Sequence, residues 1–147
     1  MKKRFTLLYL SVLSIILFSL PHAFTENTIK SDSYINQLQK SSIIKRDSTA
    51  SSLMNSRISF TAVVKSVDEN RRYNRRFRVV AEDISAAKYN MRISYFIFMG
   101  NRDIWLQINE GEKYHFTGLV TAYTPLNTQR DYYIFDVLFE SIEIIVK

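Results

Sequence analysis

The sequence predicts an all-β domain with a minor helix, and three observations support this prediction. From Arg57 onward, apolar residues tend to alternate with polar ones, which is the period of a half-buried strand. Five such segments follow one another, separated by short polar connections. Hydrophobic residues make up 46% of the 147 residues, which is enough for one packed core but not for two. We therefore predict one β-domain over residues 57–147.

The amino terminus has the pattern of a secretory signal peptide, which we place at residues 1–23. Residues 2–4 are basic, residues 5–20 carry no charge, and Ala23 offers a small residue before a cleavage site. The apolar run is shorter than the roughly 20 residues of a membrane span. We therefore predict cleavage and export to the periplasm or the cell exterior. An uncleaved membrane anchor is the alternative.

Charge and cysteine content narrow the possible partners and cofactors. The formal charge of +6 includes the three basic residues of the predicted signal peptide, so the exported chain carries only +3. This weak excess selects no partner by itself, and only a local cluster could do so. The absence of cysteine excludes a disulfide and a thiolate zinc site. The sequence predicts no cofactor and no metal.

Residues 24–56 are predicted to form a spacer with a short helix. The segment SDSYINQLQKSSIIKR offers Ser31 or Asp32 as its N-cap residue. Its apolar side chains follow one helical stripe, made of Tyr34, Ile35, Leu38 and Ile43. The next segment, DSTASSLMNS, is predicted to be a connector or a second short helical turn. We expect this spacer to dock on the β-domain.

The first two strands are predicted at residues 57–67 and 75–82, on either side of the polar turn DENRRYN. In the first strand, one side is formed by Ile58, Phe60, Ala62 and Val64. The phase then slips toward Val67, which indicates a bulge or a strong bend. In the second strand, one side is formed by Phe77, Val79 and Ala81, and the other by Arg76, Arg78 and Val80.

The third strand is predicted at residues 91–100, after the polar connection DISAAKYN. One of its faces carries Met91, Ile93, Tyr95 and Ile97, and the other carries Arg92, Ser94, Phe96 and Phe98. Both faces are partly apolar, so the periodicity does not decide which one is inside. The following segment, NRDIWLQIN, is predicted to be a short helix or turn.

The last two strands are predicted at residues 110–123 and 131–146, joined by the loop TPLNTQRD. Gly111 lies at the turn that precedes the fourth strand, and Gly118 lies inside that strand. In the final strand, one face is formed by Tyr133, Phe135, Val137 and Phe139.

Three strands, a short helical connector and two strands resemble the OB-fold, a five-stranded Greek-key barrel. The segment INEGEKYHFTGLV, residues 108–120, is similar to the entry of that family's fourth strand. There an internal glycine lets the strand coil tightly. The resemblance spans about residues 57–146, and it extends to small exported bacterial OB-fold proteins, many without assigned biochemistry. Another small antiparallel barrel or a sandwich is the alternative fold.

Residues suited to catalysis are few, and we predict that the protein is not an enzyme. His115 is the single histidine beyond the predicted signal peptide, and a lone strand histidine is more often a hydrogen-bonding residue than a ligand. The pairs at 68–69 and 82–83 place adjacent carboxylates on opposite faces of a strand. Exported thermonucleases share the OB-fold, but their Asp-Gly-Asp-Thr type of motif is absent, because no glycine precedes Gly100.

A cluster of arginines and aromatic residues is the predicted binding surface. If Phe77 and Val79 point into the barrel, the arginines beside them point outward, onto the face that an OB barrel commonly uses for binding. Guanidinium groups neutralise phosphates and aromatic rings stack on bases, which suits single-stranded nucleic acid. The candidate ligand-binding residues are Arg71, Arg72, Tyr73, Arg76, Arg78, Arg92, Phe96 and Phe98.

An ordinary surface is the competing interpretation of the same residues. Arg71 and Arg72 are then a solvated hairpin tip, and Phe96 and Phe98 are covered by the helix or by a second subunit. We predict an exported, non-catalytic binding module of the cell envelope, whose partner is a protein or an anionic oligomer such as nucleic acid or acidic glycan. The alternatives are a single-stranded nucleic-acid-binding protein and a membrane-anchored structural protein of the envelope.

Overall fold

The computed structural model describes residues 27–69 and 77–145 of the chain. The predicted signal peptide at residues 1–23 lies outside the described residues. So do Arg71, Arg72, Tyr73 and Arg76 of the predicted binding surface. No helix among the described residues is both long enough and apolar enough to cross a membrane.

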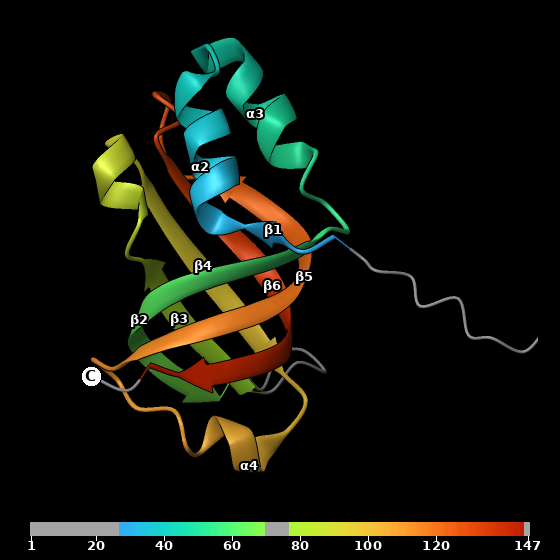
Figure 1. Ribbon diagram of the computed structural model, residues 1–147, viewed down its shortest axis with the longest axis vertical. Coiled ribbons are helices and arrows are strands. Elements are labelled where there is room, and N and C mark those ends of the chain that lie inside the picture. Colours follow the sequence, from blue (N-terminus) through green and yellow to red (C-terminus); the bar gives the residue numbers. More distant parts are fainter. Residues whose placement is uncertain (1–26, 70–76, 146–147) are drawn as a thin grey trace, which may run out of the picture.

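Within the described residues, five long strands close into a barrel, which confirms the predicted OB-like barrel fold (Figure 1). The hydrogen-bonded order is β2-β3-β4-β6-β5, and a further pairing of β5 with β2 closes the barrel. The pair β4–β6 is parallel, and the other barrel pairs are antiparallel. The barrel strands are β2 (Arg57–Glu69), β3 (Phe77–Asp83), β4 (Arg92–Met99), β5 (Lys113–Pro125) and β6 (Tyr132–Ile144).

Helices cover the two ends of the barrel and leave much of its side open. Helices α2 and α3 lie at one end and the short α4 lies at the other (Figure 1). Before α2, the short strand β1 pairs in parallel with the start of β2. These smaller elements are β1 (Ile29–Lys30), α2 (Ser31–Lys40), α3 (Ile43–Ser51), the 3-10 helix η1 (Ala86–Tyr89) and α4 (Arg102–Trp105).

Helix α2 belongs to the core of the protein because its apolar stripe packs on the barrel end. Tyr34, Ile35 and Leu38 are all buried, as the helical spacing predicts. Ile43 was expected on the same stripe, but it begins α3 and is 55% exposed. The chain turns away at Ser41 and Ser42, whose extended backbone ends one helix and precedes the next.

The predicted N-cap of α2 is wrong by one residue. Lys30 occupies the N-cap position with extended backbone, and Ser31 and Asp32 form the first turn of the helix. The pairing of Lys30 with Ser59 of β2 holds this residue extended, which the local sequence does not reveal. No side chain caps the helix amino terminus.

The alternation predicted for the barrel strands is confirmed by burial. Ile58, Phe60, Ala62 and Val64 of β2 are buried, and the expected phase slip appears as a register shift between Val64 and Ser66. In β4 the buried face is the one that carries Ile93, Tyr95 and Ile97, which settles the choice that periodicity left open. The other buried apolar and aromatic side chains of the barrel strands are Val79, Ala81, Met99, Tyr114, Phe116, Val120, Tyr133, Phe135 and Val137.

Gly118 permits a close approach of β5 and β6, in the strand where the OB-fold resemblance implies tight coiling. A Cβ atom at this position would collide with the backbone carbonyl of Leu138 and a methyl group of Val137. The ladder between the two strands shifts register at the same point, between Thr117 and Gly118. A glycine here lets β5 bend around the barrel without forcing its partner away.

Candidate functional site

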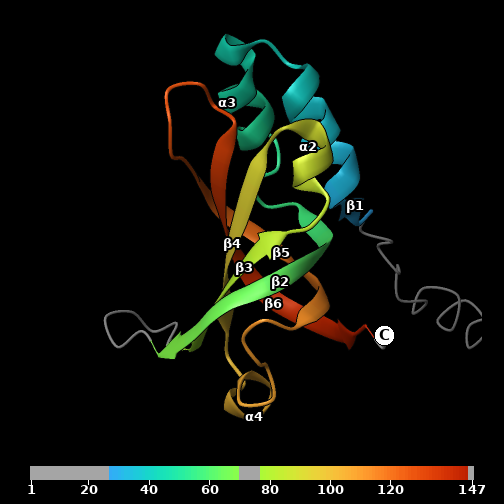
Figure 2. The ribbon, with the colours of Figure 1, turned by 90° about the vertical axis from the view of Figure 1, so that its left-hand side faces the viewer.

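Four of the predicted binding residues share the outer surface of β3 and β4. Because Val79 and Ala81 are buried, Arg78 points outward, and it lies opposite Phe98 of β4 in the strand register. Phe96 and Phe98 are partly exposed on the same side. Figure 2 shows this side of the barrel facing the viewer, with no helix in front of β3 and β4. The aromatic side chains of β4 therefore lie on the outside of the barrel, which the sequence had left open.

Strand β6 continues this surface beyond β4. Ile134 pairs with Ser94, and Leu138 pairs with Phe98. Both residues are partly exposed and alternate with buried neighbours in β6, so they lie on the outer side of the barrel. We call this surface the outer face, and it consists of Arg78, Val80, Arg92, Phe96, Phe98, Ile134 and Leu138.

Arg78 is held by a carboxylate and an aromatic ring, so its charge is not free. Its Nε and Nη2 atoms donate to Asp68 Oδ1 and Oδ2 at 3.0 and 2.9 Å, which is a bidentate ion pair across the β2–β3 ladder. The guanidinium carbon also lies 5.0 Å from the centre of the Phe96 ring, in cation–π contact. This geometry leaves the aromatic ring and a neutralised ion pair at the surface.

Arg92 is paired in the same way at the other end of β4. Its Nε donates to Glu82 Oε1 at 2.7 Å, and Lys65 Nζ lies 3.2 Å from Glu82 Oε2. Its guanidinium carbon lies 4.6 Å from the centre of the Tyr132 ring. Partial burial would raise the pKa of Glu82, but the hydrogen bonds and charges of Lys65 and Arg92 outweigh it and hold that pKa below its ordinary value.

The carboxylates on this surface are the feature that sequence reasoning missed. The sequence pattern treats Asp68 and Glu82 only as members of adjacent carboxylate pairs that are unsuited to catalysis. A signal was present, because antiparallel pairing of these two neighbouring strands can place Asp68 opposite Arg78. The pairing of Glu82 with Arg92 depends on the β3–β4 register, which the sequence does not specify.

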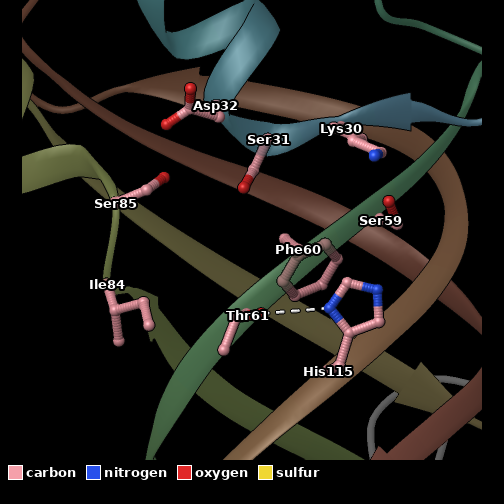
Figure 3. Close-up of a pocket in the computed structure, with 9 residues that line it drawn as sticks. All are labelled: Lys30, Ser31, Asp32, Ser59, Phe60, Thr61, Ile84, Ser85 and His115. Carbon is pink, nitrogen blue, oxygen red and sulfur yellow. Dashed lines mark hydrogen bonds between the residues drawn. The ribbon is translucent and has the colours of Figure 1, made fainter.

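A separate pocket of about 420 Å³ lies beside β2 (Figure 3). It occupies the gap between β1, which pairs with the start of β2, and the end of β3. Lys30 pairs with Ser59 on one side of this gap, and Ile84 N donates to Thr61 O on the other. The gap is therefore one residue of β2 wide, at Phe60. The complete lining is Lys30, Ser31, Asp32, Ser59, Phe60, Thr61, Ile84, Ser85 and His115.

A buried chain of hydroxyl groups reaches from this pocket into the core. Asp83 Oδ1 accepts hydrogen bonds from the amide and the hydroxyl of Ser85, at 2.7 and 2.6 Å. Asp83 Oδ2 accepts from the Tyr95 hydroxyl at 2.7 Å, and Tyr95 is also hydrogen-bonded to Tyr34. Burial raises the pKa of both tyrosines well above the ordinary value, and the nearby charge of Asp83 adds to this shift. Both phenols therefore remain protonated.

His115 is partly buried and makes a hydrogen bond, as we expected for a lone strand histidine. Its Nδ1 atom lies 3.0 Å from the Thr61 hydroxyl, across the β2–β5 ladder (Figure 3). In the part of the chain that the structure describes, no group of three or more histidine or carboxylate side chains is arranged to hold a metal ion.

Comparison of the chain with models of known protein families and with curated proteins gave no match.

Proposed function

We propose that the chain is an exported, non-catalytic binding protein of the OB-fold superfamily, and that it binds a protein partner through the outer face. The superfamily assignment is supported by the strand order, by the parallel β4–β6 pair and by the β5–β2 pairing that closes the barrel. Export is supported by the basic and apolar amino-terminal segment.

The observation that carries this proposal is the pairing of both arginines on a partly apolar surface. Asp68 neutralises Arg78, and Glu82 is shared by Arg92 and Lys65. A phosphate chain would have to displace these carboxylates, which lowers the gain from each contact. Phe96 and Phe98 instead offer aromatic area between satisfied polar groups, which is typical of protein interfaces. The partner is therefore a protein with a complementary apolar patch.

The test compares Phe96→Glu with Leu126→Glu in a binding experiment on envelope proteins from the source organism. Leu126 is an exposed apolar residue just beyond β5, so its replacement controls for the added charge. We expect the wild type and Leu126→Glu to retain the same proteins, measured by quantitative mass spectrometry, and Phe96→Glu to lose them. Retention should change little between low and moderate salt, because apolar contacts dominate.

The same samples are titrated with single-stranded DNA, RNA and an acidic glycan at several salt concentrations. Binding to a polyanion that falls steeply with salt, and that is lost in Arg78→Glu, would favour the anionic-oligomer alternative over a protein partner. Equal protein retention by the wild type and Phe96→Glu would contradict the outer face as the binding site.

A further inference from the structure

Two apolar side chains are exposed where α2 passes into α3. Ile43 and Ile44 begin α3 and are 55% and 93% exposed. Neither belongs to the buried core or to the partly buried side chains that pack against it, whereas α3 buries Ala50. Isoleucine is also a weaker helix former than the unbranched residues, because branching at Cβ restricts its side chain in a helix. Neither packing nor helix formation therefore accounts for this apolar pair.

The connection between α2 and α3 forms one extremity of the molecule. Figures 1 and 2 show it at the top in two perpendicular views, with α4 at the opposite end. In both views no other helix or strand lies beyond it. We call residues 40–46 the helix tip. Because the helix tip projects, its exposed side chains can reach a flat surface before any other part of the described structure does.

The helix tip is also the most basic part of the exported chain. It carries Lys40, Lys45 and Arg46, and residues 33–46 contain no acidic residue. The other 14 basic residues of the exported chain are balanced by its 14 acidic residues, so the net charge of +3 equals that of the helix tip. Lys40 and Lys45 are exposed and form no ion pair within the described residues. Their charges are therefore available to an anionic partner.

Hydrogen bonds hold the helix tip in place on the barrel. The Arg46 guanidinium donates to the carbonyl groups of Gln39 and Ser41 at 3.3 Å, and to two carbonyl groups of the β5–β6 connection at 3.2 Å. Asp47, the next carboxylate along the chain, accepts hydrogen bonds from two side chains at the same connection. The apolar pair and the lysines are thus presented in a fixed arrangement, which lowers the entropic cost of binding.

We propose that the helix tip binds the surface of an anionic lipid bilayer. Ile43 and Ile44 enter the headgroup region, and Lys40 and Lys45 lie beside the lipid phosphates. A projecting apolar pair flanked by lysines complements such a surface in both polarity and charge. The inference rests on the export proposed above. It uses no residue of the outer face, so the tests of the two surfaces can fail independently.

The test is co-sedimentation of the exported chain, residues 24–147, with lipid vesicles. This chain lacks the predicted signal peptide, whose apolar segment would bind lipid by itself. Vesicles of phosphatidylglycerol and phosphatidylcholine in equal amounts are compared with vesicles of phosphatidylcholine alone. We expect binding to the anionic vesicles to be at least about tenfold tighter, because each lysine near an anionic surface contributes about fivefold. The absence of binding to anionic vesicles, or equal binding to both kinds, would overturn the proposal.

Variants at the two ends of the molecule locate the site. Ile44→Ser and Leu106→Ser each remove an exposed apolar side chain, but Leu106 follows α4 at the opposite end. We expect Ile44→Ser to weaken binding to anionic vesicles about tenfold and Leu106→Ser to bind as the wild type does. Unchanged binding by Ile44→Ser, or an equal loss in both variants, would contradict insertion of the helix tip.

A second pair of variants separates a local charge effect from a general one. Lys45→Gln and Lys113→Gln change the net charge equally, and Lys113 is an exposed residue at the start of β5 with no ion pair within the described residues. We expect Lys45→Gln to weaken binding about fivefold and Lys113→Gln to have little effect. An equal loss in both variants would indicate general charge attraction and contradict the helix tip as the binding site.

Discussion

Tyr95 connects the barrel core, helix α2 and a buried carboxylate through one hydroxyl group. It donates to Asp83 at 2.7 Å and is hydrogen-bonded to Tyr34, which comes from α2. Its ring stacks on Phe60, with the ring centres 3.6 Å apart. Asp83 is buried and forms no ion pair within the described residues. Hydrogen bonds from Ser85 and Tyr95 therefore offset much of the cost of burying its carboxylate.

Replacing the two tyrosines separately tests this description. Tyr95→Phe removes a donor from Asp83 and also leaves the Tyr34 hydroxyl without its partner. Tyr34→Phe removes only the outer member of the chain and keeps the bond between Tyr95 and Asp83. We expect Tyr95→Phe to lower the free energy of unfolding by about 2–3 kcal/mol and Tyr34→Phe by about 1 kcal/mol, measured by urea denaturation. Equal losses would show that Asp83 does not depend on Tyr95.

Helix α3 is fastened to the connection between β5 and β6 by polar contacts as well as packing. Asp47 accepts hydrogen bonds from the Tyr133 hydroxyl at 3.0 Å and from Arg130 Nε at 2.9 Å. Arg46 Nη1 donates to the carbonyl groups of Gln129 and Arg130. Burial raises the pKa of Tyr133, and its hydrogen bond to Asp47 contributes to the shift. The phenol therefore remains a donor over the physiological pH range.

We expect Asp47→Ala to loosen this end of the molecule without unfolding the barrel. Hydrogen exchange, measured by mass spectrometry, should become faster in α3 and in residues 126–131. The reason is that the free energy of local opening falls by about 1 kcal/mol. Exchange in β4 should stay slow. Ser48→Ala is the matched control, because the Ser48 hydroxyl bonds only to the Lys45 carbonyl within the helix. Faster exchange throughout Asp47→Ala would indicate that α3 and the barrel open together.

At the scale of the whole molecule, ion pairs join helices and strands that are separated in the sequence. Arg57 forms an ion pair with Glu140 on β6, and Asp32 of α2 forms one with Lys88 of η1. Glu82 joins β3 to both neighbouring strands through Lys65 of β2 and Arg92 of β4. These pairs neutralise charge locally and distribute charge of both signs over the barrel.

The lowered pKa of Glu82 predicts an acid-sensitive contribution to global stability. This carboxyl group binds its proton less readily in the folded state than in the unfolded state, so its contribution is complete above the unfolded pKa. The contribution is lost as the pH falls through the folded value. We expect Glu82→Gln to be less stable than the wild type at pH 7, by about 0.5 kcal/mol.

The difference in the free energy of unfolding between the two proteins should shrink as the pH is lowered below about 4, which is near the ordinary pKa of a glutamate side chain. Urea denaturation of both proteins at a series of pH values measures it. Glu143→Gln is a suitable control, because Glu143 is an exposed carboxylate near the end of β6 with no ion pair within the described residues. If the free energies of unfolding of Glu82→Gln and the wild type differ by the same amount at all pH values, the acid-sensitive contribution of Glu82 is contradicted.

The sequence by itself determined which side of most strands is buried and in what order the elements follow. Alternation is a local property, so β2 and β3 could be oriented from their own residues, and Gly118 could be identified as a point of close approach. The helical stripe of α2 was also predicted from local spacing. The prediction was wrong at Ile43, because Ser41 and Ser42 have extended backbone and end the helix before it.

Only the tertiary structure decided which charges remain available and where a pocket forms. Asp68 and Glu82 neutralise predicted binding arginines because the strand registers bring them together. The pocket between β1 and the end of β3 is assembled from residues at 30–32, 59–61, 84–85 and 115, which no local pattern connects. Alternation depends on one strand alone, whereas ion pairs and cavities depend on how separate segments meet. That meeting is fixed by register and barrel closure, which a single sequence does not specify.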